Sequence, residues 1–132
     1  MLASLDDAKI LAGGQSLGPM LNFRYVMPEN LIDINRLTDL QGIHFESDGS
    51  VRIAAMTRQY QIEQNDQLHE RLPIFREALR WVGHYATRNR GTIGGSLSHL
   101  DPAAELPGLC ALLDAQLSIK TEAGERLLSI HD

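Results

Sequence analysis

The sequence predicts an α+β fold for one domain of 132 residues, and three observations lead to that prediction. A short apolar strand, a glycine-rich loop and a short helix open the chain. Two stretches of alternating apolar and polar residues then flank Asp48 and Gly49, a pair that tight hairpin turns favour. Apolar residues at helical spacing fill the middle, and a second alternating pair follows them. Runs of strands followed by runs of helices favour α+β packing over the strict alternation of a doubly wound sheet.

Strands are expected where apolar residues alternate with polar ones or form short buried runs. Gly124 is expected to connect the last two strands, as Gly49 connects the central pair. The predicted strands cover Ala8 to Ala12, Asn30 to Leu37, Ile43 to Glu46, Val51 to Met56, Gln116 to Thr121 and Arg126 to Ile130. A short helix over Leu17 to Phe23 links the first two.

Helical spacing dominates between residues 57 and 113. Thr57 is expected to cap the first helix of this region. Pro73 suits the first turn of the next helix and Gly83 its end, and Pro107 starts a last helix that runs to about Leu113. The apolar positions at helical spacing are Tyr60, Ile62, Leu68, Ile74, Phe75, Ala78, Leu79 and Val82. These helices would carry most of the core.

Composition excludes several classes of function. Hydrophobic residues make up 43% and charged residues 22%, so wholesale disorder is not expected. The net charge of −5 and the scattered basic residues argue against nucleic-acid binding. No apolar run reaches the roughly 18 residues of a membrane span. Acidic Asp6 and Asp7 stand where a secretory signal would carry basic residues, so a cytoplasmic location is expected.

Cysteine and histidine usage argues against a metal centre in this chain. Cys110 is the only cysteine and lies in an apolar stretch, so it is expected to be a small buried side chain, with no disulfide or iron–sulfur cluster. The five histidines are too dispersed along the sequence to indicate metal ligands. No residue is assigned to a metal and none to catalysis.

Two glycine-rich segments carry the chemical signal. The first glycine loop is "LAGGQSLGPM", residues Leu11 to Met20, and the second is "RNRGTIGGSLSHLDPAAELP", residues Arg88 to Pro107. Paired glycines let consecutive backbone N–H groups approach one anion closely. Gln15 and Ser16 in the first loop, and Thr92 in the second, add side-chain donors. Two such cradles are suited to a pyrophosphate.

The established phosphate motifs do not match either loop. GxGxxG cannot be aligned with "GGQSLG", and GxxxxGK[ST] lacks its lysine. Either loop alone is equally well explained as a tight turn after a strand, but the presence of both favours a diphosphate ligand. Charge-assisted hydrogen bonds contribute roughly 1.5–3 kcal/mol each, so several of them offset the ~4–15 kcal/mol cost of association without basic side chains.

The segments "LAGGQSL", "NFRYVMPENLIDINRL" and "RNRGTIGGSLSHLDPAAELP", in this order, resemble the FAD-binding domain of the flavin subunit of molybdenum hydroxylases. The type is that of the carbon monoxide dehydrogenase medium subunit, which is related to the flavin domain of xanthine dehydrogenase. The resemblance covers nearly the whole chain. It implies the two-subdomain α+β flavin fold of the vanillyl-alcohol oxidase type, with FAD between the subdomains and its diphosphate on both loops.

The resemblance also implies a domain organisation and a set of cofactor-binding residues. The chain would be a partial FAD-binding domain, with a first subdomain over about residues 1–56, a second over about 57–132, and the family's C-terminal domain absent. It would therefore bind FAD weakly by itself. Residues carried over as FAD-binding are Ala12, Gly13, Gly14, Gln15, Ser16, Leu17, Thr92, Ile93, Gly94, Gly95, Ser96, Asp101 and Glu105. The family often has Asn where this chain has Ser96.

In the family, the flavin receives electrons from a [2Fe–2S] cluster on a small partner subunit. A large subunit with molybdopterin oxidises the substrate, and the flavin passes electrons to an external acceptor. The resemblance thus implies an oxidoreductase subunit in which the cofactor carries the redox chemistry. Two alternatives stay open: a stand-alone flavin oxidoreductase of the same fold, and a non-catalytic nucleotide-diphosphate binder.

The sequence also predicts the environments of a few further residues. Arg88 and Arg90 are expected on a solvated loop face, with contact to phosphate as the alternative. Trp81 is expected in the core or at an interface. Asp101 is expected to cap or turn the chain before Pro102, with ribose contact as the alternative. Replacing Gly94 by valine is expected to abolish flavin loading and leave the fold intact.

Overall fold

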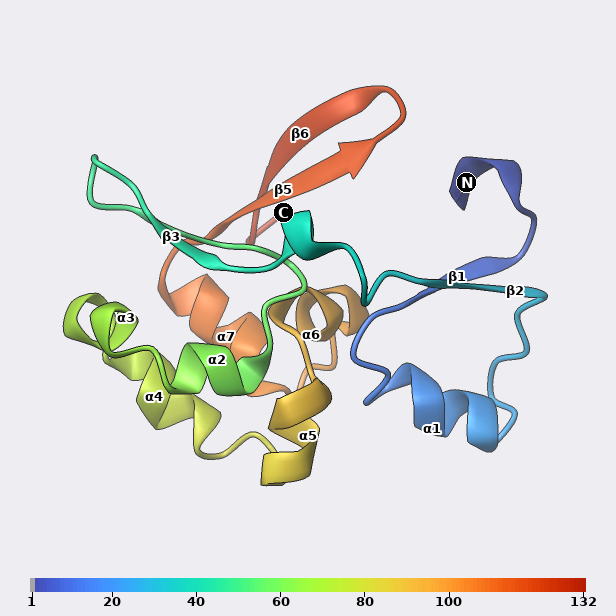
Figure 1. Ribbon diagram of the computed structural model, residues 1–132, viewed down its shortest axis with the longest axis horizontal. Helices are drawn as coiled ribbons and strands as arrows, with labels where there is room; N and C mark the ends of the chain where they lie inside the picture. Colours follow the sequence, from blue (N-terminus) through green and yellow to red (C-terminus); the bar gives the residue numbers. More distant parts are fainter. Residues whose placement is uncertain (1) are drawn as a thin grey trace.

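The computed structural model describes residues 2–132 and contains both helices and strands, as the α+β prediction requires. The strands are β1 (Ala8–Leu11), β2 (Asn30–Asp33), β3 (Ile43–Phe45), β4 (Val51–Ile53), β5 (Gln116–Thr121) and β6 (Gly124–Ser129). The helices are η1 (Leu2–Ser4), α1 (Leu17–Asn22), η2 (Thr38–Leu40), α2 (Gln59–Glu63), α3 (Asp66–Arg71), α4 (Ile74–Leu79), α5 (Tyr85–Arg90), α6 (Ile93–His99) and α7 (Glu105–Leu112). In Figure 1, β1, α1 and β2 form one region, and α2 to α7 with two hairpins form another.

The N-terminal region is a strand–helix–strand unit. β1 and β2 pair in parallel from Ala8 opposite Asn30 to Leu11 opposite Asp33, and α1 lies in the connection between them. The amide of Ile34 donates to the carbonyl of Leu11 over 3.1 Å just past the strand ends. Since both strands end at the same edge, the residues that follow β1 and β2 emerge side by side. The first glycine loop is therefore placed next to the residues that follow β2.

The structure contains the two antiparallel hairpins that the alternating apolar and polar residues predict. β3 pairs with β4, and β5 pairs with β6. Gly49 and Gly124 take φ values of +89° and +129° at the two turns, a region that glycine enters without penalty. Each sheet among the described residues has only two strands. Such small sheets need packing against helices for stability.

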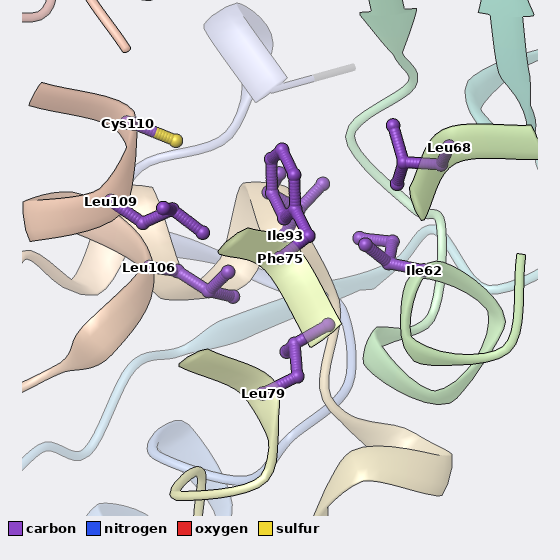
Figure 2. Close-up of a cluster of buried hydrophobic side chains, with 8 residues drawn as sticks. All are labelled: Ile62, Leu68, Phe75, Leu79, Ile93, Leu106, Leu109 and Cys110. Carbon is purple, nitrogen blue, oxygen red and sulfur yellow. The ribbon is translucent and has the colours of Figure 1, made fainter. Parts of the chain in front are cut away.

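The core lies between the helices of the second region (Figure 2). Leu79 and Ile62 have no exposed surface, and the cluster brings together α2, α3, α4, α6 and α7. Its buried members are Ile62, Leu68, Phe75, Leu79, Ile93, Leu106, Leu109 and Cys110. Cys110 is only 5% exposed, as its apolar surroundings in the sequence predict. Helical spacing thus located half of this cluster, Ile62, Leu68, Phe75 and Leu79, whereas Ile74 is 38% exposed.

The hairpin of β3 and β4 packs with the helices. Its apolar side chains Ile43, Phe45, Val51 and Ile53 lie against the helical core, although the predicted boundary near residue 56 puts them in the first subdomain. The packing favours a boundary before this hairpin. The division of the chain into two subdomains stays a prediction.

Several helix ends differ from the sequence predictions. Thr57 does not cap α2, because its hydroxyl donates to the carbonyl of Gly42 and accepts from the amide of Gly42, both over 3.0 Å. A second helix, α3, begins after Asn65, whose side chain accepts from the amide of Leu68 over 2.7 Å. α7 begins at Glu105, two residues before Pro107. The bonds of the Thr57 hydroxyl to the distant backbone of Gly42 override its local capping preference.

Trp81 and the second glycine loop differ from the sequence predictions. Trp81 is 79% exposed, so it does not belong to the core. The second glycine loop is largely helical, because α6 runs through Ile93–His99 where the sequence predicts no helix. Within residues 2–132, the structure has no helix with the length and apolar character needed to cross a membrane.

Candidate functional site

The two glycine loops lie against each other. A Cβ placed on Gly13 would overlap the carbonyl oxygen of Arg90 and lie 3.0 Å from the Cα of Gly91. A Cβ placed on Gly95 would lie 3.8 Å from that of Ala12. Figure 1 shows the same relationship, with the segment between β1 and α1 directed toward α5 and α6. Segments almost eighty residues apart in the sequence therefore form one surface, and Gly13 is required for their close approach.

The first glycine loop presents unpaired backbone donors. Among residues 2–132, no group accepts a hydrogen bond from the amides of Gly13, Gly14, Gln15, Ser16 or Leu17. Gly14 takes a φ of +70°, and its carbonyl accepts from the amide of Gly18 over 3.0 Å. Consecutive free amides around a left-handed residue are the arrangement that binds anions in backbone nests.

The side chain of Gln15 has a different role from the one expected. Its Nε2 donates to the carbonyl of Gly13 over 3.2 Å, so it fixes the orientation of the Gly13–Gly14 peptide. Because C=O and N–H point in opposite directions across a trans peptide, the amide of Gly14 faces away from Gln15. Ser16 makes no side-chain cap to α1. Gln15 thus shapes the loop from within.

The second glycine loop differs from the expected cradle, because its amides already have partners. The amide of Ile93 donates to Thr57 over 3.2 Å, that of Gly94 to the carbonyl of Ala55 over 2.8 Å, and that of Ser96 to Thr92 over 3.1 Å. The amide of Gly95 donates to the Thr92 hydroxyl oxygen over 3.1 Å. Backbone N–H groups engaged in this way cannot also hold a phosphate. The loop contributes its shape and close approach instead.

Thr92 and Gly94 are placed by the structure around them. Thr92 caps α6 and is 2% exposed, and it pairs with Arg58 as an isolated β-bridge. A Cβ on Gly94 would lie 2.7 Å from both the Cβ and the carbonyl oxygen of Ala55. The absence of a side chain at Gly94 therefore lets α6 pack closely against Ala55, in the segment that follows β4. The expectation that Gly94→Val leaves the fold intact is wrong for this reason.

Asp101 and Glu105 lie beyond α6. The Asp101 carboxylate accepts from the amide of Ala103 over 2.9 Å, which is the turn expected before Pro102. Glu105 is the first residue of α7 and is half-buried. In the part of the chain that the structure describes, no hydrogen bond or ion pair joins either residue to the first glycine loop. Their contact with a cofactor stays a prediction.

Arg88 and Arg90 have different environments. Arg88 pairs with Glu63 over 2.9 Å, with 13% and 19% of the two side chains exposed, and it also donates to the carbonyl of Val82 over 3.1 Å. It is therefore a structural side chain and not a phosphate ligand. Arg90 is exposed beside the first loop.

Two residues outside both predicted loops connect them. The guanidinium of Arg58 donates through Nη1 to the carbonyl of Arg90 and through Nη2 to Oδ1 of Asn35, the latter over 2.6 Å. Nδ2 of Asn35 donates to the carbonyl of Ala12 over 2.9 Å. The sequence gives one signal for Asn35, since it follows β2 at the edge where the first loop leaves β1. It gives none for Arg58.

Asp33 anchors this connection. Its carboxylate accepts from the backbone amide of Asn35 over 2.8 Å and from the side chain of Asn35 over 2.5 Å. These hydrogen bonds, followed by the positive charges of Arg36 and Arg90, lower the pKa of Asp33. The pKa of Arg58 is also lowered, mainly by burial and then by the nearby charge of Arg90. The outer edge of the loops therefore carries ionised groups of both signs.

Two surface hollows lie away from the first glycine loop. One is lined by Glu63, Gln64, Asp66, Arg76, Arg80 and Tyr85, and a smaller one lies between the η2–β3 connection and α2. Neither is lined by a residue of the first glycine loop. Residues 2–132 also contain no group of three or more metal-ligating side chains.

Comparisons with known proteins identify the family of this chain. The whole sequence, residues 1–132, matches the family model described as the FAD binding domain in molybdopterin dehydrogenase. The chain belongs to this family, which confirms the resemblance carried by the two glycine loops.

Two curated relatives and one solved structure illustrate the similarity. The 6-hydroxypseudooxynicotine dehydrogenase complex subunit alpha of Paenarthrobacter nicotinovorans is 47% identical over 96% of this chain and 43% of its own length. The carbon monoxide dehydrogenase medium chain of Hydrogenophaga pseudoflava is 41% identical over 91% of this chain and 42% of its own. Quinoline 2-oxidoreductase from Pseudomonas putida 86 aligns with a TM-score of 0.95 at 42% identity, over 99% of this chain and 46% of that one. The chain thus spans less than half the length of these relatives.

Proposed function

We propose that this chain binds FAD and that the first glycine loop holds the diphosphate. The observation that carries the proposal is the row of unpaired amides from Gly13 to Leu17 next to the second glycine loop. Each charge-assisted hydrogen bond from such an amide contributes roughly 1.5–3 kcal/mol. Membership of an FAD-binding family supports a flavin dinucleotide over other diphosphates.

The residues of the two loops would divide the work. The amides of Gly13 to Leu17 would bind the phosphate oxygens, and Gln15 would hold the loop in shape through its bond to Gly13. The second loop would form the neighbouring wall, with Gly95 close to Ala12. Among the remaining predicted contacts, Ser96, Asp101 and Glu105 would act through side chains. The buried Thr92 and Ile93 and the closely packed Gly94 would shape this wall from within. FAD, when bound, supplies the redox chemistry.

At the level of the whole protein, we propose the flavin subunit of a molybdenum hydroxylase. Electrons from a small subunit with a [2Fe–2S] cluster would reach an external acceptor through the FAD of this domain, and a large molybdopterin subunit would oxidise the substrate. Support comes from relatives named as a dehydrogenase complex subunit and a medium chain. The proposal includes the vanillyl-alcohol oxidase type of fold and a cytoplasmic location. A single buried cysteine, with no disulfide to form, agrees with that location.

The cradle is tested by titrating the full chain with FAD, FMN and ADP. Binding through the diphosphate predicts that FAD binds at least about tenfold more tightly than FMN, which has one phosphate, and that ADP competes with FAD. Equal affinity for FAD and FMN would place the diphosphate elsewhere. Flavin absorbance in the purified protein separates this function from a flavin-free nucleotide binder.

A matched pair of glycine variants locates the diphosphate. Gly14→Ala and Gly49→Ala each put a side chain on a residue with positive φ, at +70° and +89°, so both are expected to lower stability by about 1 kcal/mol. Only Gly14 lies among the unpaired amides. FAD affinity is therefore expected to fall with Gly14→Ala and to stay unchanged with Gly49→Ala. Co-purification of iron–sulfur and molybdopterin subunits with the full chain tests the partners.

A further inference from the structure

The bridge formed by Asn35 and Arg58 belongs to neither glycine loop, yet it touches both. One end bonds to the carbonyl of Ala12 in the first loop and the other to the carbonyl of Arg90 in the second. The two side chains meet through the 2.6 Å hydrogen bond from Arg58 to Asn35. We propose that Arg58 is a positioning residue that acts through Asn35 to hold the two loops in the arrangement that binds the diphosphate. The part of this proposal that concerns binding of the diphosphate rests on the proposed function.

The bridge fixes the direction of a free amide. Asn35 holds the carbonyl of Ala12, and across the trans peptide the amide of Gly13 points to the opposite side. The amide of Gly13 is the first of the unpaired donors. Rotation of the Ala12–Gly13 peptide would remove that donor from the row. The bond from Asn35 therefore orients the start of the anion cradle.

The same bridge keeps the second loop in contact with Gly13. Arg58 holds the carbonyl of Arg90, and this is the oxygen against which the backbone of Gly13 packs. A planar guanidinium can donate to two separate acceptors at fixed angles, whereas a lysine ammonium offers a single point charge. The geometry at this position therefore requires arginine.

The backbone around Arg58 is anchored independently of its side chain. The amide of Gln59 donates to Gly91 over 2.9 Å and the amide of Ile93 donates to Thr57 over 3.2 Å. The amide of Arg58 is bonded to the side chain of Gln61 over 2.9 Å. Removing the guanidinium should therefore leave α2 and α6 joined. What is lost is the connection to the first glycine loop.

The positive charge of Arg58 and its neighbours would also favour binding of an anion, in addition to the positioning of the loops. Arg90 lies close enough to affect the titration of both Arg58 and Asp33, and Arg36 also acts on Asp33. Among the described residues Arg58 makes no ion pair with a carboxylate, and the charge of Asp33 acts on it only as a weaker influence. Positive charge at the rim of a cradle strengthens its hydrogen bonds to a phosphate.

The experiment uses the full chain with Arg58→Met, Arg58→Lys and Asn35→Ala, and with Arg80→Met as the matched arginine control. The Arg80 side chain is 64% exposed, and among residues 2–132 it pairs only with Glu77. The first readout is the NOE between the α-protons of Gly13 and Gly91 in the protein without ligand, which their close approach predicts. The second readout is FAD affinity by titration.

Arg58→Met is expected to lose the NOE and to weaken FAD binding about 10- to 100-fold, with Arg58→Lys in between and Arg80→Met unchanged. The double variant with Asn35→Ala should bind no more weakly than the worse single variant, because both act through one bridge. An unchanged NOE or an unchanged FAD affinity in Arg58→Met overturns the proposal. If the wild-type chain binds no FAD, the proposed function fails, while the NOE still decides whether Arg58 joins the loops. If Arg58→Met does not fold, Arg58→Lys decides the outcome by the same readouts.

Discussion

The backbone of Gly13 lies directly against the carbonyl oxygen of Arg90, and no side chain fits between them. The contact joins the loop that follows β1 to the end of α5. The φ of Gly13 is not in the left-handed region. An alanine at position 13 would therefore be disfavoured only by the overlap of its Cβ with the carbonyl oxygen of Arg90. This makes Gly13 a clean probe of whether the two loops must touch.

Gly13→Ala is expected to push the loops apart and to weaken FAD binding at least about tenfold, because the added Cβ overlaps the Arg90 carbonyl. The measurement is FAD titration alongside chemical denaturation. Gly18→Ala is the matched control, since a Cβ there meets no atom within 4 Å. Equal FAD affinity in the two variants would show that contact between the loops is not needed for binding.

Gly94→Ala is expected to destabilise the fold by about 1–3 kcal/mol, because its Cβ would lie 2.7 Å from the backbone and side chain of Ala55. Urea denaturation measures the change. Gly108 is the control: it lies within α7 with open space around its Cβ position, so Gly108→Ala should stabilise by up to about 1 kcal/mol. Full stability of Gly94→Ala would mean that α6 can move away from Ala55 at little cost.

The sequence predicted the elements that depend on local pattern. Alternation and Asp48-Gly49 located the central hairpin, and helical spacing located Leu79 and Phe75 in the core. It missed α6, because two adjacent glycines disfavour a helix locally, while the Thr92 cap and the bond from Gly94 to Ala55 stabilise it. Local pattern carries no information on such long-range bonds.

The candidate site was predictable to a similar extent. The glycines and the family resemblance identified both loops, and the structure brings them together at Gly13 and Gly95. Which amides remain free depended on tertiary hydrogen bonds to Thr57 and Ala55. The bridge between Asn35 and Arg58 spans 23 positions of sequence. A single sequence contains no signal for such a pairing.

Arg88→Met is expected to lower stability by about 1–3 kcal/mol, because it leaves the mostly buried carboxylate of Glu63 without its partner. It also removes the bond to the carbonyl of Val82, which shapes the turn before α5. Thermal or urea denaturation measures the loss. Arg80→Met removes an exposed pair with Glu77 and should change stability by less than about 0.5 kcal/mol. Similar losses in both variants would contradict a special role for the Arg88 pair.

The thiol of Cys110 is expected to resist alkylation in the folded protein. It is 5% exposed, and burial raises its pKa, so both access and the thiolate fraction are reduced. Iodoacetamide labelling at pH 8 should be at least ~100-fold slower than in the urea-unfolded chain. Cys110→Ala gives the background. Rapid labelling under native conditions would show that α7 opens locally.

Asp33 is expected to stabilise the strand–helix–strand unit at neutral pH and to lose this effect only in acid. Its pKa is lowered in the folded state by the two hydrogen bonds from Asn35. Above the ordinary carboxyl pKa of about 3.9, both states are ionised and the contribution is complete. As the pH falls below that value, the unfolded chain takes up its proton first, so the stability difference shrinks until the folded carboxyl is also protonated.

Urea denaturation of wild type and Asp33→Ala across a pH series measures this dependence. The difference in unfolding free energy should be constant from about pH 5 to 8 and should narrow below about pH 4. Asp39→Ala serves as the control, because Asp39 lies in η2 and makes no ion pair among residues 2–132. Because Asn35 also holds the carbonyl of Ala12, FAD affinity should decline over the same acidic range in wild type and not in Asp33→Ala. A constant stability difference down to pH 2.5 would mean that Asn35 is held in place without the charge of Asp33.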